Sequence, residues 1–236
     1  VRRNLDDKGA LIDTQETVNT KFDARGNVLD QTITTKDAAG KSLGSTHVVN
    51  SGFNLRGNPG KTIRENLDPA GKLVDKQEIT NKSFDKRGNV LEQEIITRDP
   101  AGKQITRQVV SNSDYNSRGN PAAVVRKNYD ETNALVDVQE IANKKFDARG
   151  NIVEQVIVTK DDAGLVLSKA EVFNSNFDSR GNIGKTIRKN YDEAGKLIDQ
   201  QEINNSKFDS RGNVLEQTVV SKDVDGKQVS KSVVSN

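Results

Sequence analysis

A four-residue motif, Asp or Asn followed by two variable residues and Gly, recurs along the whole chain. The spacing between its successive glycines alternates between 17 and 14, which defines a 31-residue repeat with no insertion or deletion. Fourteen of the 18 glycines occupy these positions, and Asn133 fills the one gap in the series. A chain with this spacing is expected to fold as a repeat array, because every repeat makes the same turn at the same place.

The motif has the residue preferences of a type I β-turn followed by a left-handed residue. Asp at the first position accepts hydrogen bonds from backbone amides ahead of it, and Gly at the fourth position adopts a positive φ easily. Pro69 and Pro100 stand at the second position, where the turn requires the φ that a proline ring imposes. Such turns join antiparallel strands, so the motif predicts about fifteen turns between about sixteen strands. The predicted turn residues include Asp23, Gly26, Asp37, Gly40, Asp68, Gly71, Asp85, Gly88, Asp99, Gly102, Asp147, Gly150, Asp192, Gly195, Asp209 and Gly212.

A longer, 62-residue repeat is superimposed on the first. Segment 22–37 recurs at 84–99, 146–161 and 208–223, whereas 53–68, 115–130 and 177–192 form a second series. Both ends of the chain interrupt a repeat, and neither has the atypical sequence of a capping repeat. We therefore expect residues 1–236 to form one continuous array of about seven and a half repeats, excised from a longer protein.

Composition argues against most catalytic and metal-binding sites. The chain has no Cys, Met or Trp and one histidine, His47, so it lacks the residues for disulfides, a Cys nucleophile or a His-based zinc site. His47 stands where other repeats have Glu or Val, and we interpret it as a surface substitution. We predict no enzymatic activity, no catalytic residue and no cofactor.

Charge and hydropathy narrow the possible partners. The 36 basic and 34 acidic residues are evenly spread and leave a net charge of +2, which does not favour binding to nucleic acid. No apolar run approaches the roughly 18 residues of a membrane span, so we predict no membrane insertion. The doublet Asp161-Asp162 and the pair Asp223 and Asp225 raise the question of calcium, but neither lies in an EF-hand loop. We interpret these aspartates as turn caps and predict no metal site.

The fold expected from these patterns is all-β. Val and Ile outnumber Leu, which favours strands, and we predict an elongated repeat array of β-hairpins; a β-solenoid with one 31-residue coil per repeat is the alternative. An Asn recurs once per 31-residue repeat where the facing of the apolar residues reverses, which predicts a bulge or corner there. Bulky residues before the turns, such as Phe22, Phe84, Tyr129 and Tyr191, are expected to form one thin layer of the core. The recurring residues are Asn19, Asn50, Asn81, Asn112, Asn143, Asn174, Asn205 and Asn236.

A row of arginines bears on both the fold and the function. Each precedes the glycine of an Arg-Gly-Asn sequence, and the row comprises Arg25, Arg56, Arg87, Arg118, Arg149, Arg180 and Arg211. Neighbours in the row would lie about 4.8 Å apart in a solenoid and about 9.6 Å apart in a hairpin array. Repulsion between like charges favours the wider spacing, whereas stacking of the asparagines would favour the solenoid.

The same row is the best candidate for a functional site. Guanidinium groups on one edge could bind an anionic polysaccharide through paired hydrogen bonds to its acidic groups. The alternative is that each Arg is neutralised by an Asp of its own turn or by an acidic residue of the following strand, such as Asp30, Glu92, Glu154 or Glu216.

Several segments resemble the YD, or Rhs, repeats of large bacterial secreted and surface proteins. The resemblance rests on Tyr191-Asp192-Glu193-Ala194-Gly195, on Tyr129-Asp130 and on the Phe-Asp-x-x-Gly-Asn series. It implies β-hairpin sheets that build shells or rods, around toxins or on cell surfaces. We predict a non-enzymatic structural segment of an extracellular fibre, stalk or cell-surface adhesin that self-associates. The alternatives are an adhesin that binds anionic glycans through the Arg row, and a toxin-encapsulating shell.

Overall fold

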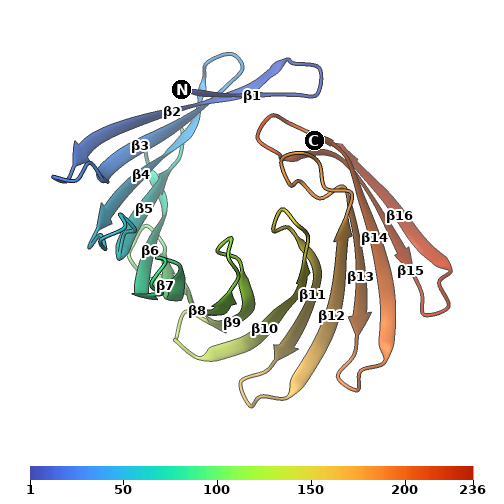
Figure 1. Ribbon diagram of the computed structural model, residues 1–236. Coiled ribbons are helices and arrows are strands. Elements are labelled where there is room, and N and C mark those ends of the chain that lie inside the picture. Colours follow the sequence, from blue (N-terminus) through green and yellow to red (C-terminus); the bar gives the residue numbers. More distant parts are fainter. Residues whose placement is uncertain (236) are drawn as a thin grey trace. The chain divides into compact units, whose positions relative to one another are not determined.

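The protein is described by a computed structural model of residues 1–235, and these residues form strands and turns without a helix (Figure 1). Sixteen strands follow one another in chain order in one sheet. The strands are β1 (Arg2–Leu5), β2 (Leu11–Phe22), β3 (Val28–Asp37), β4 (Ser42–Ser51), β5 (Lys61–Leu67), β6 (Leu73–Phe84), β7 (Val90–Arg98), β8 (Gln104–Tyr115), β9 (Pro121–Tyr129), β10 (Leu135–Phe146), β11 (Ile152–Lys160), β12 (Val166–Ser175), β13 (Lys185–Tyr191), β14 (Leu197–Phe208), β15 (Val214–Lys222) and β16 (Gln228–Ser235).

The predicted hairpin array is confirmed. Strands adjacent in the chain pair antiparallel, as β2 does with β3 and β3 with β4, instead of stacking on the strand one repeat away. The solenoid alternative is therefore wrong. The stacking of asparagines that favoured it does not occur, because strands that carry the recurring Asn alternate with strands that do not.

The chain divides into two compact units. The first contains Val1–Leu5, Ala10–Ser111 and Arg126–Val136, and the second contains Asp6–Gly9, Asn112–Val125 and Asp137–Asn236. In the first unit each strand from β1 to β8 pairs with the next, and in the second the strands from β10 to β16 do the same. Both units therefore have the same local architecture.

Two kinds of turn alternate along the chain. We call the Arg-Gly-Asn turns, which follow the even-numbered strands, RGN turns, and the turns that follow the odd-numbered strands distal turns. They lie at opposite ends of the strands, so each unit has an RGN edge and a distal edge. The repeat glycines have φ between 78° and 89°, and Asn133 has φ 67°. In the first RGN turn the Gly26 amide donates to the Asp23 carbonyl at 3.0 Å.

Six of the recurring asparagines mark a bulge or a strand end. The register shifts just after Asn19, Asn81, Asn143 and Asn205 in the even strands β2, β6, β10 and β14. Strands β4 and β12 instead end one residue after their Asn, at Ser51 and Ser175. The expected Asn236 lies outside the described residues.

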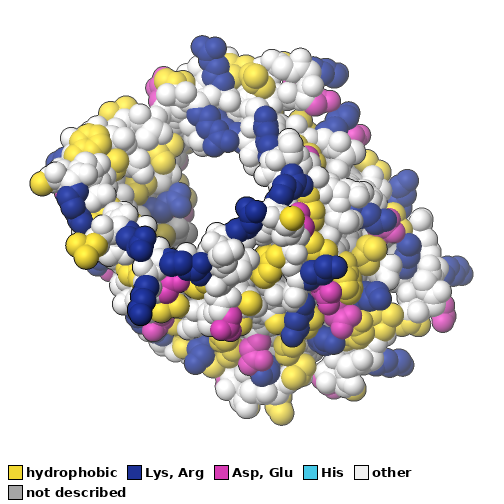
Figure 2. Space-filling view, in the orientation of Figure 1, with side chains coloured by type: hydrophobic (Ala, Val, Ile, Leu, Met, Phe, Trp, Pro, Cys, Tyr) yellow, Lys and Arg dark blue, Asp and Glu magenta, His cyan; other side chains and the backbone are white. Residues whose placement is uncertain are grey.

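The sheet has very little buried apolar interior. Among the described residues, Val48 and Ala170 are the only buried hydrophobic side chains, at 6% and 4% exposure. The space-filling view shows apolar side chains at the surface among both kinds of charge (Figure 2). Since fewer apolar groups are removed from water than in a globular domain, hydrogen bonds and ion pairs carry more of the stability.

The expected single layer of bulky residues is wrong. Phe22 and Phe84 end even strands at the RGN edge, whereas Tyr129 and Tyr191 end odd strands at the distal edge. Antiparallel neighbours run in opposite directions, so residues that precede alternate turns are carried to opposite edges. Phe22 is 55% exposed, which also excludes it from a core.

The two faces of the sheet differ in chemistry. On one, which we call the amide face, cross-strand partners are amides and aliphatic residues, as in the pairs Asn81–Gln93 and Ile79–Ile95. On the other, the charged face, Lys and Arg alternate with Glu across strands. Arg107 Nε donates to Glu94 Oε1 at 2.6 Å, and Lys36 Nζ lies 2.8 Å from Glu16 Oε2.

One carboxylate on the charged face gives a pH prediction. Hydrogen bonds from Lys185 and then Lys222 lower the pKa of Glu202 to about 2. Because this pKa lies below the unfolded value of 4.5, the stabilisation is present above pH 4.5 and is lost as the pH falls toward 2. In urea unfolding measured across this range, Glu202→Gln should be the less stable at neutral pH and should lose less stability on acidification. Parallel pH profiles for the two proteins would contradict this assignment.

Candidate functional site

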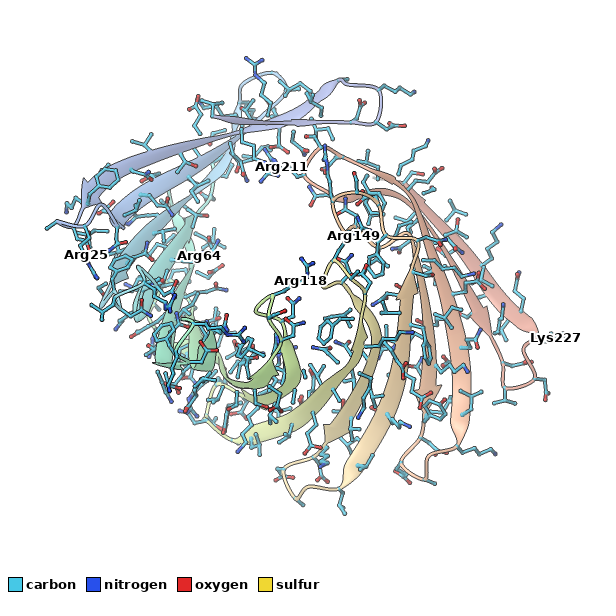
Figure 3. The ribbon with its side chains drawn as sticks, viewed as in Figure 1. Arg25, Arg64, Arg118, Arg149, Arg211 and Lys227 are labelled. Atoms are coloured by element: carbon cyan, nitrogen blue, oxygen red, sulfur yellow. The ribbon has the colours of Figure 1, made fainter. Side chains whose placement is uncertain are left out.

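The Arg row lies along the RGN edge, one side chain at the third position of each turn. Arg118 and Arg149 project from consecutive RGN turns of the second unit, whereas Lys227 follows a distal turn at the opposite edge from Arg211 (Figure 3). The side chains of Arg25, Arg87 and Arg149 are 46–49% exposed. The row is therefore placed at one edge in each unit.

Three of these arginines, all in the second unit, reach the next RGN turn. Arg118 Nη2 donates to the Ala148 carbonyl at 2.6 Å, and Arg180 Nη1 donates to the Ser210 carbonyl at 2.6 Å. Arg149 Nη1 donates to the Asp178 carbonyl at 2.8 Å. Backbone carbonyls carry partial negative charge, so these contacts hold consecutive turns together without a carboxylate partner.

Contacts between the row and acidic side chains are longer. Arg25 Nε lies 4.0 Å from Asp23 Oδ2, and the equivalent distances at Arg87 and Arg149 are 3.8 and 3.9 Å. Two of the strand carboxylates considered as partners, Asp30 and Glu216, bind other groups instead. Asp30 accepts from Thr20 at 2.8 Å, and Glu216 accepts from Ser206 at 2.8 Å.

The Asn that follows each RGN glycine adopts one of two arrangements. Where the turn begins with Asp, the amide closes on that residue: Asn27 Nδ2 donates to Asp23 Oδ2 at 2.7 Å, and this bond is the main cause of the lowered pKa of Asp23. Where the turn begins with Asn, the amide reaches the next turn instead. Asn58 Nδ2 donates to the Gly88 carbonyl at 2.9 Å, and Asn120 Nδ2 donates to the Gly150 carbonyl at 2.8 Å.

These contacts crowd the glycines of RGN turns that follow an earlier RGN turn, whereas a Cβ added at Gly26, in the first of them, would meet nothing within 4 Å. A Cβ added at Gly150 would lie 2.6 Å from Arg118 Cδ, and one added at Gly212 would lie 2.5 Å from Asn182 Oδ1. At the distal glycines Gly71, Gly164 and Gly195 an added Cβ would meet nothing within 4 Å. These later RGN glycines are therefore crowded by side chains of the preceding turn, whereas the distal glycines are not. Distal turns are still joined in the first unit, where Gln104 Nε2 donates to the Asp130 carbonyl at 3.0 Å and Lys103 pairs with Glu131 at 2.9 Å.

The distal turns are built by their first aspartate. Asp68 Oδ1 accepts from the amides of Ala70 and Lys72, both at 2.9 Å, and Asp99 and Asp192 accept from the amide four residues ahead at 2.8 Å. Asp37 accepts from the Lys41 amide in the same way. Through these bonds, the first aspartate of each of these distal turns caps its own turn.

The recurring Asn connects three strands, a role that the sequence did not reveal. In strand β10, Asn143 Nδ2 donates to the carbonyl of Pro121, the first residue of β9. Asn143 Oδ1 accepts a hydrogen bond from Gln155 of β11 at 2.7 Å. Asn81 makes the same two bonds, at 2.9 and 2.7 Å, and Asn205 does so at 2.9 Å each. The signal that could have found it is a Gln or Thr at the twelfth position after the Asn, which is present for every recurring Asn up to Asn205 except Asn112, where Val124 stands there.

His47 lies between carboxylates of the two neighbouring strands, β3 and β5. His47 Nε2 lies 3.2 Å from Asp30 Oδ1, and its Nδ1 lies 3.7 Å from Glu65 Oε2, so its two nitrogens face different carboxylates. Within residues 1–235, no three His, Asp or Glu side chains converge as ligands for one ion. The same residues include no helix of the length and hydropathy needed to cross a bilayer.

No protein-family description matches the chain, and no curated protein sequence does. Among solved structures it has a weak likeness to the Tc holotoxin pore of Photorhabdus luminescens, at 12% identity and a TM-score of 0.15, over 89% of this chain and 15% of that one. It is similar to a TcdB2–TccC3 complex at 11% identity and a TM-score of 0.16, over 94% and 16% of the two chains. The chain thus spans about one sixth of the length of these structures.

Proposed function

We propose that the chain is a non-enzymatic structural segment of an extracellular fibre, stalk or adhesin, in which each 62-residue repeat is an interchangeable module. The observation that carries the proposal is the recurrence of the same side-chain bridges in both units. Asn81 and Asn205, two 62-residue steps apart, bind equivalent carbonyls and glutamines. A catalytic site needs one distinctive constellation, whereas a scaffold needs the same contact many times.

A deletion in register tests this modularity. Removal of residues 33–94, one complete 62-residue repeat, joins Thr32 to Ile95, and Ile95 is the repeat equivalent of Ile33. We expect a folded protein with the same β-sheet circular dichroism per residue and a cooperative urea transition. The reason is that each strand still pairs with strands of the same repeat type.

The matched control removes one residue more. Deletion of residues 33–95 shifts the second half of the joined strand by one position and exchanges its two faces. This variant should unfold at a lower urea concentration than the in-register one. Equal stability of the two deletions, or failure of the in-register variant to fold, would count against a modular scaffold.

The exposed guanidinium groups support a second candidate, binding of an acidic polysaccharide. A depression of about 210 Å³ lies between consecutive RGN turns, lined by Arg149, Asn151, Ser179, Arg180 and Gly181. Each guanidinium has five N–H donors, so its bonds to carbonyls leave donors available for a second partner.

Binding of this kind should depend on salt and on the row. We expect polygalacturonate to bind at low ionic strength and to be released by about 0.5 M NaCl, since exposed charges are then screened. Arg149→Gln together with Arg180→Gln should weaken binding measured by titration calorimetry. Arg188→Gln, in a strand away from the RGN edge, is the control, and identical binding by all three proteins would refute the role of the row.

A further inference from the structure

The third 62-residue repeat, residues 115–176, departs from the second (53–114) and the fourth (177–236) at three positions that face the same way. Ala123, Ala142 and Val156 are all small or apolar. The second repeat has Lys61, Thr80 and Glu94 there, and the fourth has Lys185, Asn204 and Thr218. Among these three repeats, polar groups are thus replaced by apolar ones only in the third.

The pairing of the strands places Ala123, Ala142 and Val156 close together on the charged face. Ala142 is paired with Val156, and Glu140 with Val158, across strands β10 and β11. In the fourth repeat Lys185 Nζ lies 2.5 Å from Glu202, but Ala123 offers no such cation to Glu140. The result is an apolar depression of about 390 Å³ over β9, β10 and β11, with Lys144 at its margin.

The same repeat also carries an apolar projection. Leu165, Val166 and Leu167 are consecutive and are 67%, 36% and 50% exposed. Leu165 directly follows a distal turn. Five other 31-residue repeats have a lysine at this position: Lys41, Lys72, Lys103, Lys196 and Lys227. The carboxylate of Asp162 is exposed in the turn just before it.

The projection and the depression are complementary in two respects. The projection offers a branched aliphatic side chain next to a carboxylate. The depression offers an apolar floor next to the ammonium group of Lys144, and the one carboxylate in its lining, Glu140, is paired with Lys160 at 2.6 Å. Both lie in the second unit, and both arise where the third repeat departs from its neighbours. A contact that uses both would explain why the two departures occur together.

We propose that the Leu165 turn of one copy of the chain inserts into the apolar depression of a second copy, with Asp162 facing Lys144. The inference deepens the proposed structural role, on which it rests, by giving arrays a specific lateral contact. An open depression on a sheet encloses little of a free small molecule, whereas a side chain fixed on a partner can anchor there. The net charge of +2 leaves little overall repulsion between copies.

Residues taken from the protein's own repeats provide the test variants. The depression is filled by Ala123→Lys, Ala142→Thr and Val156→Glu, which copy the second repeat, and the projection is removed by Leu165→Lys. Leu55→Ser is the control, because Leu55 is 96% exposed on another turn and Ser117 stands at the equivalent place. Circular dichroism and urea unfolding establish that each variant folds.

Sedimentation equilibrium of the full chain gives the outcome. The wild type and Leu55→Ser should exceed the 25.9 kDa monomer mass as concentration rises, whereas the filled and Leu165→Lys variants should associate about tenfold or more weakly. An equimolar mixture of these two variants should associate again, because one supplies the projection and the other the depression.

Three results would overturn the proposal: a wild type that stays monomeric, a Leu165→Lys variant that associates normally, or a mixture that fails to recover. The modular role is tested separately by the register deletions. A monomeric wild type whose in-register deletion still folds would refute the lateral contact and leave the structural role standing.

Discussion

Replacing Asn143 by alanine is expected to lower the free energy of unfolding by about 2–4 kcal/mol. The Asn143 side chain is 6% exposed and makes one bond to the Pro121 carbonyl and one to Gln155. Its removal leaves a carbonyl and a side-chain amide without their partner in a half-buried position, and such groups cost more than the lost bond itself. Urea denaturation followed by circular dichroism measures the change.

The chain contains its own control for this substitution. Asn19 occupies the equivalent position in the first repeat, but it is exposed. Asn19→Ala should therefore change the free energy of unfolding by less than about 0.5 kcal/mol, as is usual for surface positions. Equal losses for Asn19→Ala and Asn143→Ala would show that the residue acts locally and does not join three strands.

The second large effect is expected at a glycine of the RGN edge. Gly150 and Gly164 have φ of 86° and 85°, so an alanine at either position is strained to the same degree, by about 1–2 kcal/mol. Only at Gly150 does the added Cβ also collide with Arg118 and Asn120, 2.6 and 2.8 Å away. Relief of that collision breaks the bonds from these side chains to the Ala148 and Gly150 carbonyls.

Gly150→Ala should therefore destabilise the protein by about 2–4 kcal/mol, roughly twice the effect of Gly164→Ala. Urea unfolding of the two variants side by side measures the difference, in which the shared backbone strain cancels. The same comparison at Gly212 and Gly195 provides an independent repeat in the same unit. A Gly164→Ala variant as unstable as Gly150→Ala would contradict the closer packing of the RGN edge.

The strands and turns were predictable because their causes are local. An Asp, a Gly three residues later and the intervening Pro at positions such as 69 and 100 each favour the same turn within four residues. Strict spacing then determines strand length, and short connections make antiparallel neighbours. The hairpin array follows from these features without knowledge of any long-range contact.

The contacts between turns were not predictable in the same way. Arg118 meets Ala148 of the next RGN turn, and which atom it meets depends on the separation of the two turns and not on either turn alone. The repeat predicts that the arginines of the row share one edge, but it does not predict that they donate hydrogen bonds to backbone carbonyls. Likewise, the substitutions at Ala123, Ala142 and Val156 are visible in the sequence, whereas their convergence requires the strand register.

The unequal edges give the sheet a mechanical asymmetry. In the second unit, side chains tie each RGN turn to the next, so separating those turns breaks hydrogen bonds, as at Arg180 and Ser210. The distal glycines of that unit have open space around them, so the distal turns lack the side-chain crowding of the RGN edge. Within the second unit, a bending load would therefore be resisted more strongly at the RGN edge than at the distal edge.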